Sequence, residues 1–184
     1  MKTLNPQGID DMLLYRLGRV LGTAGSLITR ICEGEFGITR REWRVLANLA
    51  KSDGLLSSEL AEVAQLDRAR TSRAVTALVA KQLVVRVPRP HDRRQVALHL
   101  SEAGRALYQA VLPRATAIHR ELVAPLSPEQ AAQLDALLAL LQHQADTMQR
   151  DADLPKADRR RGGRKVGHDY RRGTPAGSAG EEGG

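Results

Sequence analysis

Three arginines stand close together near the start of the stretch Asp67–Lys81, which reads DRARTSRAVTALVAK. Its apolar residues recur at spacings of three and four, which is typical of one buried face of a helix, and Asp67 is a suitable N-cap. The candidate DNA contacts on this helix are Arg68, Arg70, Thr71, Ser72, Arg73 and Thr76. Because arginine pairs with guanine edges and clamps phosphates, the pattern predicts a helix that enters the major groove of duplex DNA. A merely solvated basic face is the alternative.

A second basic stretch follows, in which two β-prone runs, Val84–Val87 and Val96–Leu100, flank a polar tip from Pro88 to Arg94. This arrangement predicts a β-hairpin, with prolines marking the turn. The candidate contacts on the tip are Arg89, Asp92, Arg93 and Arg94. An arginine at a loop tip can enter the narrow minor groove of DNA, where the electrostatic potential is most negative. We therefore expect Arg94 to make a second DNA contact, with Asp92 holding its guanidinium in position.

Short helices upstream would position both basic stretches. Thr39–Glu42 (TRRE) has the pattern of a capping box and opens a helix that ends at the residues SDG, 52–54. A short helix over Ser57–Ala64 and a tight corner at Gln65 and Leu66 precede the basic helix. The order of elements predicts a mainly α protein with a small β-hairpin wing, a winged helix-turn-helix over about residues 39–100.

The composition agrees with a duplex DNA partner. The 184 residues carry a formal net charge of +7, and only 3% of them are aromatic. Few aromatic residues leave little surface for stacking unpaired bases, so contacts to duplex phosphates are favoured over single-strand binding.

The run Asp92–Gly104, DRRQVALHLSEAG, is similar to the wing-to-helix signature of the MarR family of winged-helix regulators. The resemblance covers about residues 9–145 and includes the strings REWRVL, SSELA and LDRARTSRAV. It implies a homodimeric transcriptional regulator, usually a repressor. Two positions depart from the family pattern. Gln82 stands where Gly is usual, and Leu56 replaces the usual Ser or Thr cap, so Ser57 is expected to cap the short helix with a shifted start.

Leucine-rich amphipathic helices are expected at both ends of the folded region, over about residues 9–32 and 101–150. Ser101 is a suitable cap within the second region, and Ser127 to Gln130 (SPEQ) is a further helix start. These helices have little to pack on within one winged helix, so a homodimer that buries them matches a palindromic operator. Residues 1–150 would then form one domain, and the basic, Gly-rich residues 151–184 a disordered tail.

The resemblance also implies a small aromatic or phenolic ligand, bound in a cleft between the dimerisation helices and the winged helix, that releases the operator. The candidate ligand contacts are Tyr15, Arg16, Arg19 and Trp43. Each has an ordinary alternative, because a tryptophan on an apolar stripe is often a core residue and an arginine is often a surface residue.

Other classes of function have weaker support. The lone Cys32 leaves an oxidant-sensing regulator as one alternative, and a non-specific architectural DNA-binding protein is another. The histidines have no paired ligand spacing, so we expect no metal site and no cofactor. The chain has no serine elbow and no carboxylate pair in an apolar setting, which argues against an enzyme. Without a membrane span or a signal pattern, we expect no membrane association and a cytoplasmic protein.

Overall fold

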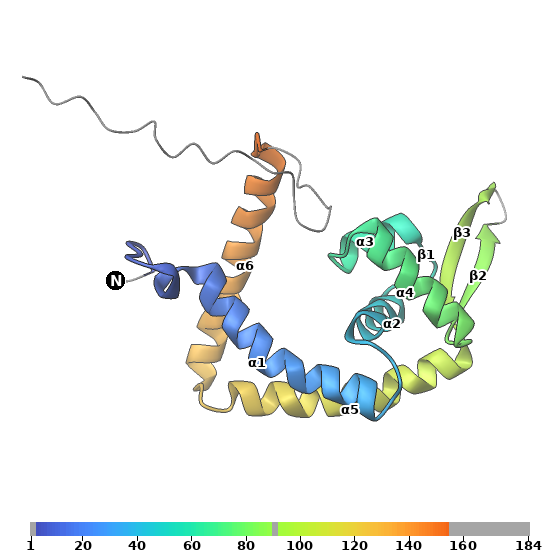
Figure 1. Cartoon of the computed structure of the whole chain (residues 1–184), viewed down its shortest axis with the longest axis horizontal. Helices are drawn as coiled ribbons and strands as arrows, with labels where there is room; N and C mark the ends of the chain where they lie inside the picture. Colours follow the sequence, from blue (N-terminus) through green and yellow to red (C-terminus); the bar gives the residue numbers. More distant parts are fainter. Residues whose placement is uncertain (1–2, 90–91, 155–184) are drawn as a thin grey trace, which may run out of the picture. The chain divides into compact units, whose positions relative to one another are not determined.

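The computed structural model describes residues 3–89 and 92–154, and for residues 92–94 it describes the backbone only (Figure 1). The chain divides into two compact units with their boundary between Ala132 and Gln133. In chain order the elements are the 3-10 turn η1 (Ile9–Asp11), α1 (Leu13–Gly34), α2 (Arg40–Lys51), β1 (Leu55–Leu56), α3 (Ser57–Val63), α4 (Arg68–Ala80), β2 (Val84–Arg89), β3 (Asp92–Leu100), α5 (Glu102–Val123) and α6 (Pro128–Asp151). The predicted fold class, mainly α with a small wing, is confirmed.

Side-chain caps define where four of the helices begin, at the residues that the sequence indicated. Thr39 and Glu42 form a reciprocal capping box at α2: the Thr39 hydroxyl accepts from the Glu42 N–H at 3.2 Å, and the Glu42 carboxylate accepts from the Thr39 N–H at 2.6 Å. Three further side chains accept a hydrogen bond from the backbone N–H three residues later: Asp67 at α4, Ser101 at α5 and Ser127 at α6. Each cap satisfies amide donors that have no partner inside the helix.

Two helix starts differ from the prediction. The expected single helix from Ile9 is interrupted at Met12, whose extended backbone separates η1 from α1. Ser57 is the first helical residue of α3 and not its cap, so the expected shifted start is wrong. Leu56 occupies the N-cap position, where its side chain can accept no hydrogen bond. Of the two hydrogen bonds of a capping box, only one is therefore formed, from the Leu56 N–H to the Glu59 carboxylate at 2.7 Å.

The three strands form an antiparallel sheet in the order β1-β3-β2. The wing strands are longer than predicted, because β2 continues to Arg89 and β3 begins at Asp92. Pro88, expected in the turn, pairs with Val96 instead. Proline is tolerated there because β2 lies at an edge of the sheet, where one side of the strand needs no N–H donor. The sequence analysis missed β1, whose two residues pair with Leu98 and Ala97 of β3.

The apolar core lies among α2, α3, α4 and the sheet, and the end of α1 and the first half of α5 close it. Its buried members include Cys32, Ile38, Val45, Leu46, Leu49, Leu60, Val75, Leu78, Val84, Leu98, Leu100 and Val111. By contrast, α6 has no buried residue. The winged helix therefore has a core of its own within one chain.

The predicted disordered tail, residues 151–184, lies almost wholly outside the described residues, which end at Leu154. Within the described part of the chain, no helix is long and apolar enough to cross a membrane.

Candidate nucleic-acid interface

Helix α4 presents a basic outer face. Ala74, Val75 and Leu78 are buried against the core, whereas five of the predicted contacts are exposed: Arg68, Arg70, Ser72, Arg73 and Thr76. The sixth, Thr71, is fully buried, and its hydroxyl donates to the Asp67 carbonyl oxygen at 3.1 Å. Thr71 therefore supports the start of the helix from below the surface that could meet DNA.

Asp67 orients the first turn of this face in two ways. One carboxylate oxygen accepts from the Arg70 N–H at 2.9 Å, and the other lies 3.0 Å from Arg70 Nε. The cap and the ion pair together hold the Arg70 guanidinium beside the helix start, so part of its positive charge is already compensated within the protein.

The wing joins α4 through Arg86, whose guanidinium donates to the Thr76 hydroxyl at 3.3 Å. The predicted contact Arg89 is held against the protein, because it donates to Gln95 Oε1 at 3.2 Å and to the Gly54 carbonyl oxygen at 3.4 Å. The side chains of Asp92, Arg93 and Arg94 lie outside the described residues, so their predicted pairing and contact remain a prediction.

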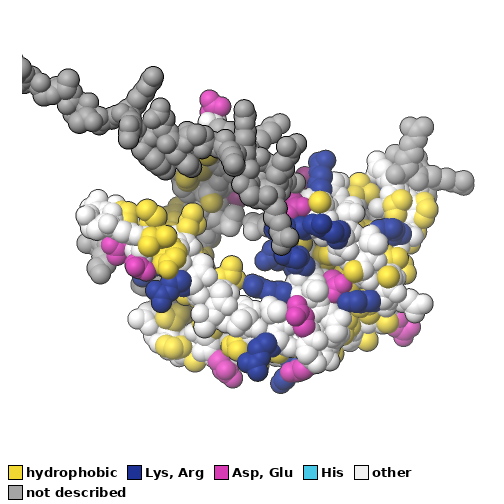
Figure 2. All heavy atoms as spheres, in the orientation of Figure 1, with side chains coloured by type: hydrophobic (Ala, Val, Ile, Leu, Met, Phe, Trp, Pro, Cys, Tyr) yellow, Lys and Arg dark blue, Asp and Glu magenta, His cyan; other side chains and the backbone are white. Residues whose placement is uncertain are grey.

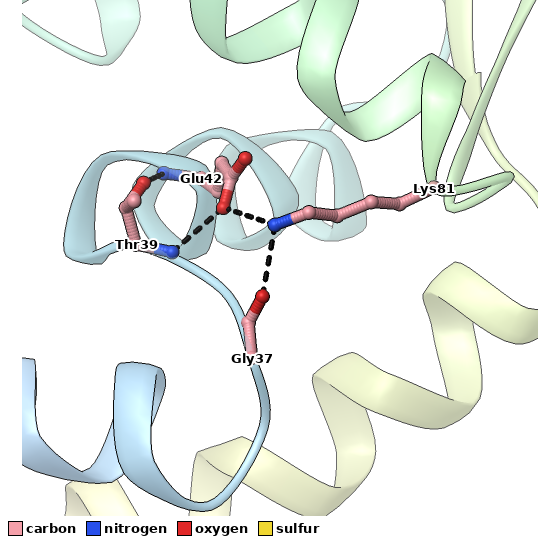
Figure 3. A network of polar contacts seen from close by, with 4 residues as sticks. All are labelled: Gly37, Thr39, Glu42 and Lys81. Carbon is pink, nitrogen blue, oxygen red and sulfur yellow. Dashed lines mark hydrogen bonds and ion pairs between the residues drawn. The ribbon is translucent and has the colours of Figure 1, made fainter.

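A half-buried ion pair fixes the far end of α4 to the first turn of α2, and a hydrogen bond fixes it to the loop before α2 (Figure 3). The Glu42 carboxylate is only 5% exposed and lies 2.9 Å from Lys81 Nζ, which also donates to the Gly37 carbonyl oxygen at 2.8 Å. Glu42 therefore has two roles, since it completes the capping box of α2 and holds Lys81. Its buried charge is paired and hydrogen-bonded, which is the condition under which a buried carboxylate is tolerated.

Further basic residues surround α4 that the sequence analysis did not select. Figure 2 shows Lys and Arg side chains gathered over the part of the molecule where Figure 1 labels α2 to α4. Arg41 of α2 lines a small pocket of about 230 Å³ together with Arg70 and Arg73 of α4. A signal for Arg41 was present, because the capping box fixes the start of α2 and its buried stripe, Glu42 to Leu49, places Arg41 outside.

The comparisons with known proteins agree with this arrangement. A family model for the MarR family matches residues 36–95. The HTH-type transcriptional repressor MdtR of Bacillus subtilis is 30% identical over 111 residues, which cover 60% of this chain and 72% of MdtR. The chain belongs to the MarR family.

Two further proteins are similar to the chain. The homoprotocatechuate degradative operon repressor of Escherichia coli is 28% identical over 101 residues, 55% of this chain and 68% of that protein. The structure of a mutant MarR from E. coli complexed with operator DNA has a TM-score of 0.59 at 26% identity and covers 70% of this chain and 94% of that one. These relatives are regulators of transcription, as the sequence analysis expected, and not enzymes.

Apart from the candidate DNA-binding surface, this MarR-family chain has open pockets between α1 and α5. Two predicted ligand contacts, Arg16 and Arg19, line one of about 640 Å³. A neighbouring pocket of about 580 Å³ is mainly aliphatic and contains Arg40 and His119. Trp43 lies elsewhere, stacked on Tyr108 with ring centroids 5.5 Å apart and packed against the core. Tyr15 is exposed and lines neither pocket.

Arg40 is the polar residue of the aliphatic pocket that the sequence analysis missed. It packs against α1 where a glycine leaves room: a Cβ on Gly25 would lie 2.6 Å from Arg40 Nη1. Among the described residues, the Arg40 guanidinium makes no hydrogen bond or ion pair. A half-buried, unpaired guanidinium in an aliphatic pocket is suited to bind a carboxylate.

The environment of Cys32 is unfavourable for oxidant sensing. The side chain is fully buried, and burial, with a smaller contribution from Glu33, raises the pKa of the thiol despite the opposing charge of Arg40. The thiol therefore stays protonated and shielded, whereas reactive cysteines are accessible thiolates. No group of His, Cys, Asp and Glu in the described part of the chain could hold a metal ion.

Proposed function

We propose that the chain is a homodimeric repressor that binds a palindromic operator and is released by a small aromatic acid. The observation that carries the DNA-binding part is the exposed basic face of α4 with the wing beside it, joined at Thr76 and Arg86. In winged-helix proteins such a helix reads base edges in the major groove while the surrounding cations hold phosphates.

Exposed leucines support the homodimer. Six large apolar side chains of α6 are at least 39% exposed: Leu134, Leu137, Leu138, Leu140, Leu141 and Met148. Helix α1 likewise exposes Leu14, Leu17, Val20 and Leu21. Apolar surface of this extent is unusual on a soluble monomer and is typical of an interface. A twofold dimer would cover both sets and present two copies of α4 to a palindrome.

The DNA-binding proposal is tested by selection from a pool of randomised duplexes, followed by titration of the selected duplex against random competitor DNA. We expect a palindromic consensus and a preference of at least about 1,000-fold over random sequence. An architectural protein would instead bind both duplexes nearly equally. In the same assay Arg94→Ala should weaken binding by roughly 1–3 kcal/mol without changing the dimer, and unchanged affinity would exclude Arg94 as the wing contact.

The aliphatic pocket between α1 and α5 supports the ligand part. Its walls would cover an aromatic ring, and the unpaired Arg40 guanidinium would bind the carboxylate of the ligand. Arg40 is the first residue of α2, so a ligand held there touches both α1 and the winged helix. By linkage, such a ligand weakens DNA binding only as far as it prefers the dimer that does not fit the operator, typically by 1–3 kcal/mol.

A thermal-shift screen of benzoate-like and phenylacetate-like acids, with their uncharged amides as controls, tests this pocket. We expect the acids to raise the melting temperature and to lower operator affinity, and Arg40→Met to abolish both effects while leaving DNA binding without ligand intact. Arg19→Ala should blunt the response as well if the ligand extends into the neighbouring pocket. Equal responses of wild type and Arg40→Met would place the ligand elsewhere.

A further inference from the structure

We propose that Arg41, Arg70 and Arg73 form a phosphate-binding site, through which helix α2 contacts the DNA backbone beside the groove that α4 enters. This inference rests on the proposed function, because it requires DNA on the α4 face. It adds a contact from an element outside the recognition helix and the wing, and it assigns the role of backbone anchor to Arg41.

The geometry of the pocket brings the three arginines together. Thr39, Arg41 and Glu42 line it from the start of α2, and Arg70, Arg73, Ala74 and Ala77 line it from one side of α4. Because the side chains of the two alanines are short, they leave a hollow of about 230 Å³ that the longer arginine side chains surround. Arg70 and Arg73 are one helical turn apart, which places them on the same side of the helix.

The charges around the pocket do not cancel. The Glu42 carboxylate is neutralised by Lys81, and the Arg70 guanidinium pairs with Asp67. Arg41 and Arg73 make no hydrogen bond or ion pair with any residue that the structure describes. Elsewhere on the surface Arg19, Arg105 and Arg114 each lie near a carboxylate. Two uncompensated guanidinium groups beside one hollow therefore favour an anion, and a phosphodiester offers the paired oxygens that arginine binds best.

The location decides which anion is expected. Arg73 and Arg70 belong to the exposed face that is proposed to enter the major groove, whereas Arg41 stands on the neighbouring helix. A group bound between them lies beside the groove, where the sugar-phosphate backbone runs. Contacts of this kind fix the register of a protein on DNA and carry no base specificity.

The test compares Arg41→Gln with wild type on a duplex selected by the wild-type protein and on a random duplex, over a series of chloride concentrations. We expect Arg41→Gln to weaken both complexes by a similar factor, roughly 3- to 10-fold, and to lower the slope of log K against log [salt] by about one per protomer, which is about two for the dimer. Arg120→Gln, which removes an exposed arginine near the end of α5, is the matched control and should change neither quantity.

A second measurement locates the contact. Replacing single phosphates of the selected duplex by neutral methylphosphonates should reveal one position in each half-site where the replacement weakens binding of wild type but weakens binding of Arg41→Gln no further. A variant with wild-type affinity and salt slope, or with additive losses at every phosphate, would overturn the site. Inorganic phosphate in place of chloride, at equal ionic strength, should not weaken the wild-type complex more than it weakens the Arg41→Gln complex. A larger loss for wild type would assign the pocket to a free anion. If wild type selects no duplex at all, the proposed function fails instead of this site.

Discussion

The winged helix and helix α6 use their apolar residues in opposite ways. Between Ile38 and Val111 most of the large apolar side chains form a closed core, at whose edge even the charged Glu42 is buried, paired with the partly exposed Lys81. Helix α6 has five leucines and buries none of them. The first region can thus be stable within one chain, whereas the second exposes an apolar surface that the proposed homodimer would cover.

This difference predicts that substitutions in the two regions change different properties of the protein. The winged helix is defined by contacts within the chain, so substitutions there should change the free energy of unfolding. The apolar faces of α6 and of the first half of α1 are exposed within one chain and would be covered by a second chain in the proposed homodimer, so substitutions there should change association. The predictions below test that separation.

The largest effect is expected from Gly104→Ala at the start of α5. A Cβ at this position would overlap the Leu83 carbonyl oxygen, which also accepts the Ser101 N–H at 3.1 Å. Because backbone atoms must move, we expect a loss of roughly 3 kcal/mol or more in the free energy of unfolding, measured by urea titration.

Gly18→Ala in α1 is the matched control. A Cβ there meets nothing within 4 Å in one chain, so the added helix propensity should raise stability by about 0.5–1 kcal/mol. A loss of stability or of the dimer in Gly18→Ala would mean that the partner helix packs directly against this glycine.

The second effect concerns the half-buried ion pair between Glu42 and Lys81. Lys81→Met leaves the Glu42 carboxylate buried without its cation and removes the bond to the Gly37 carbonyl oxygen. We expect a loss of about 2–3 kcal/mol, less than for a fully buried pair because Lys81 is partly exposed to water. Lys51→Met is the control, because Lys51 is an exposed lysine at the end of α2, the helix of Glu42. This substitution should change the free energy of unfolding by less than about 0.5 kcal/mol. Equal effects would show that the pair adds little.

How well the sequence predicted the fold depended on the range of the interactions. The caps at Thr39, Asp67, Ser101 and Ser127 were found because their signal lies within four residues. Strand β1 was missed because two leucines carry no periodicity and pair with residues more than 40 positions away. The extension of β2 through Pro88 was missed for a related reason, since only the position of β2 at the sheet edge makes that proline acceptable.

The candidate site followed the same rule. The exposed face of α4 could be predicted from its own periodicity, although Thr71, selected as a DNA contact, lies on the buried face of the helix. Arg40 and Arg86 are distinguished by a neighbour on another element, Gly25 for Arg40 and Thr76 for Arg86. The exposed position of Arg41 could be predicted from α2 alone, but its proximity to Arg73 could not. Contacts between distant elements leave no local pattern, so a single sequence could not reveal them.

The third prediction addresses association. Leu137→Asp on α6 should raise the dissociation constant of the dimer at least about 10-fold, because it places a charge in a desolvated apolar interface. The stability of the winged helix should change by less than about 0.5 kcal/mol, since Leu137 is 57% exposed in one chain. Sedimentation at several protein concentrations measures the dimer, and Val63→Asp on α3, also an exposed position, is the control. Loss of the dimer in Val63→Asp alone would place the interface on the winged helix.

A smaller effect is expected at Gln82, where the family usually has glycine. Its φ of +59° lies in the left-handed region that glycine adopts without strain. Gln82→Gly keeps the carbonyl oxygen that accepts from the Ser101 hydroxyl at 2.7 Å, so we expect a gain of up to about 1 kcal/mol after the added chain entropy is deducted. Gln133→Gly, inside α6, should instead weaken its helix by about 1 kcal/mol. Opposite signs in thermal melts would confirm the difference in backbone; equal losses would mean that the Gln82 side chain contributes packing.

The smallest effect should appear in the pH dependence at Asp53. Burial raises the pKa of this carboxyl, but the hydrogen bond and charge of His99, with help from Arg105, lower it overall. A carboxyl with a depressed pKa in the folded state adds stability above its unfolded pKa of about 3.9, and this stability is lost as the pH falls through the folded value. Because the side chain is 42% exposed, we expect Asp53→Asn to cost only a few tenths of a kcal/mol near pH 6, with the difference from wild type disappearing as the pH falls through the lowered pKa of the folded state. Asp135→Asn on α6, where the described residues offer no ion pair, is the control. A cost of Asp53→Asn that does not change with pH would show that hydrogen-bond geometry, and not charge, gives Asp53 its role. The contact between Asp53, in the turn after α2, and His99 of β3 would then stabilise the fold without an electrostatic contribution.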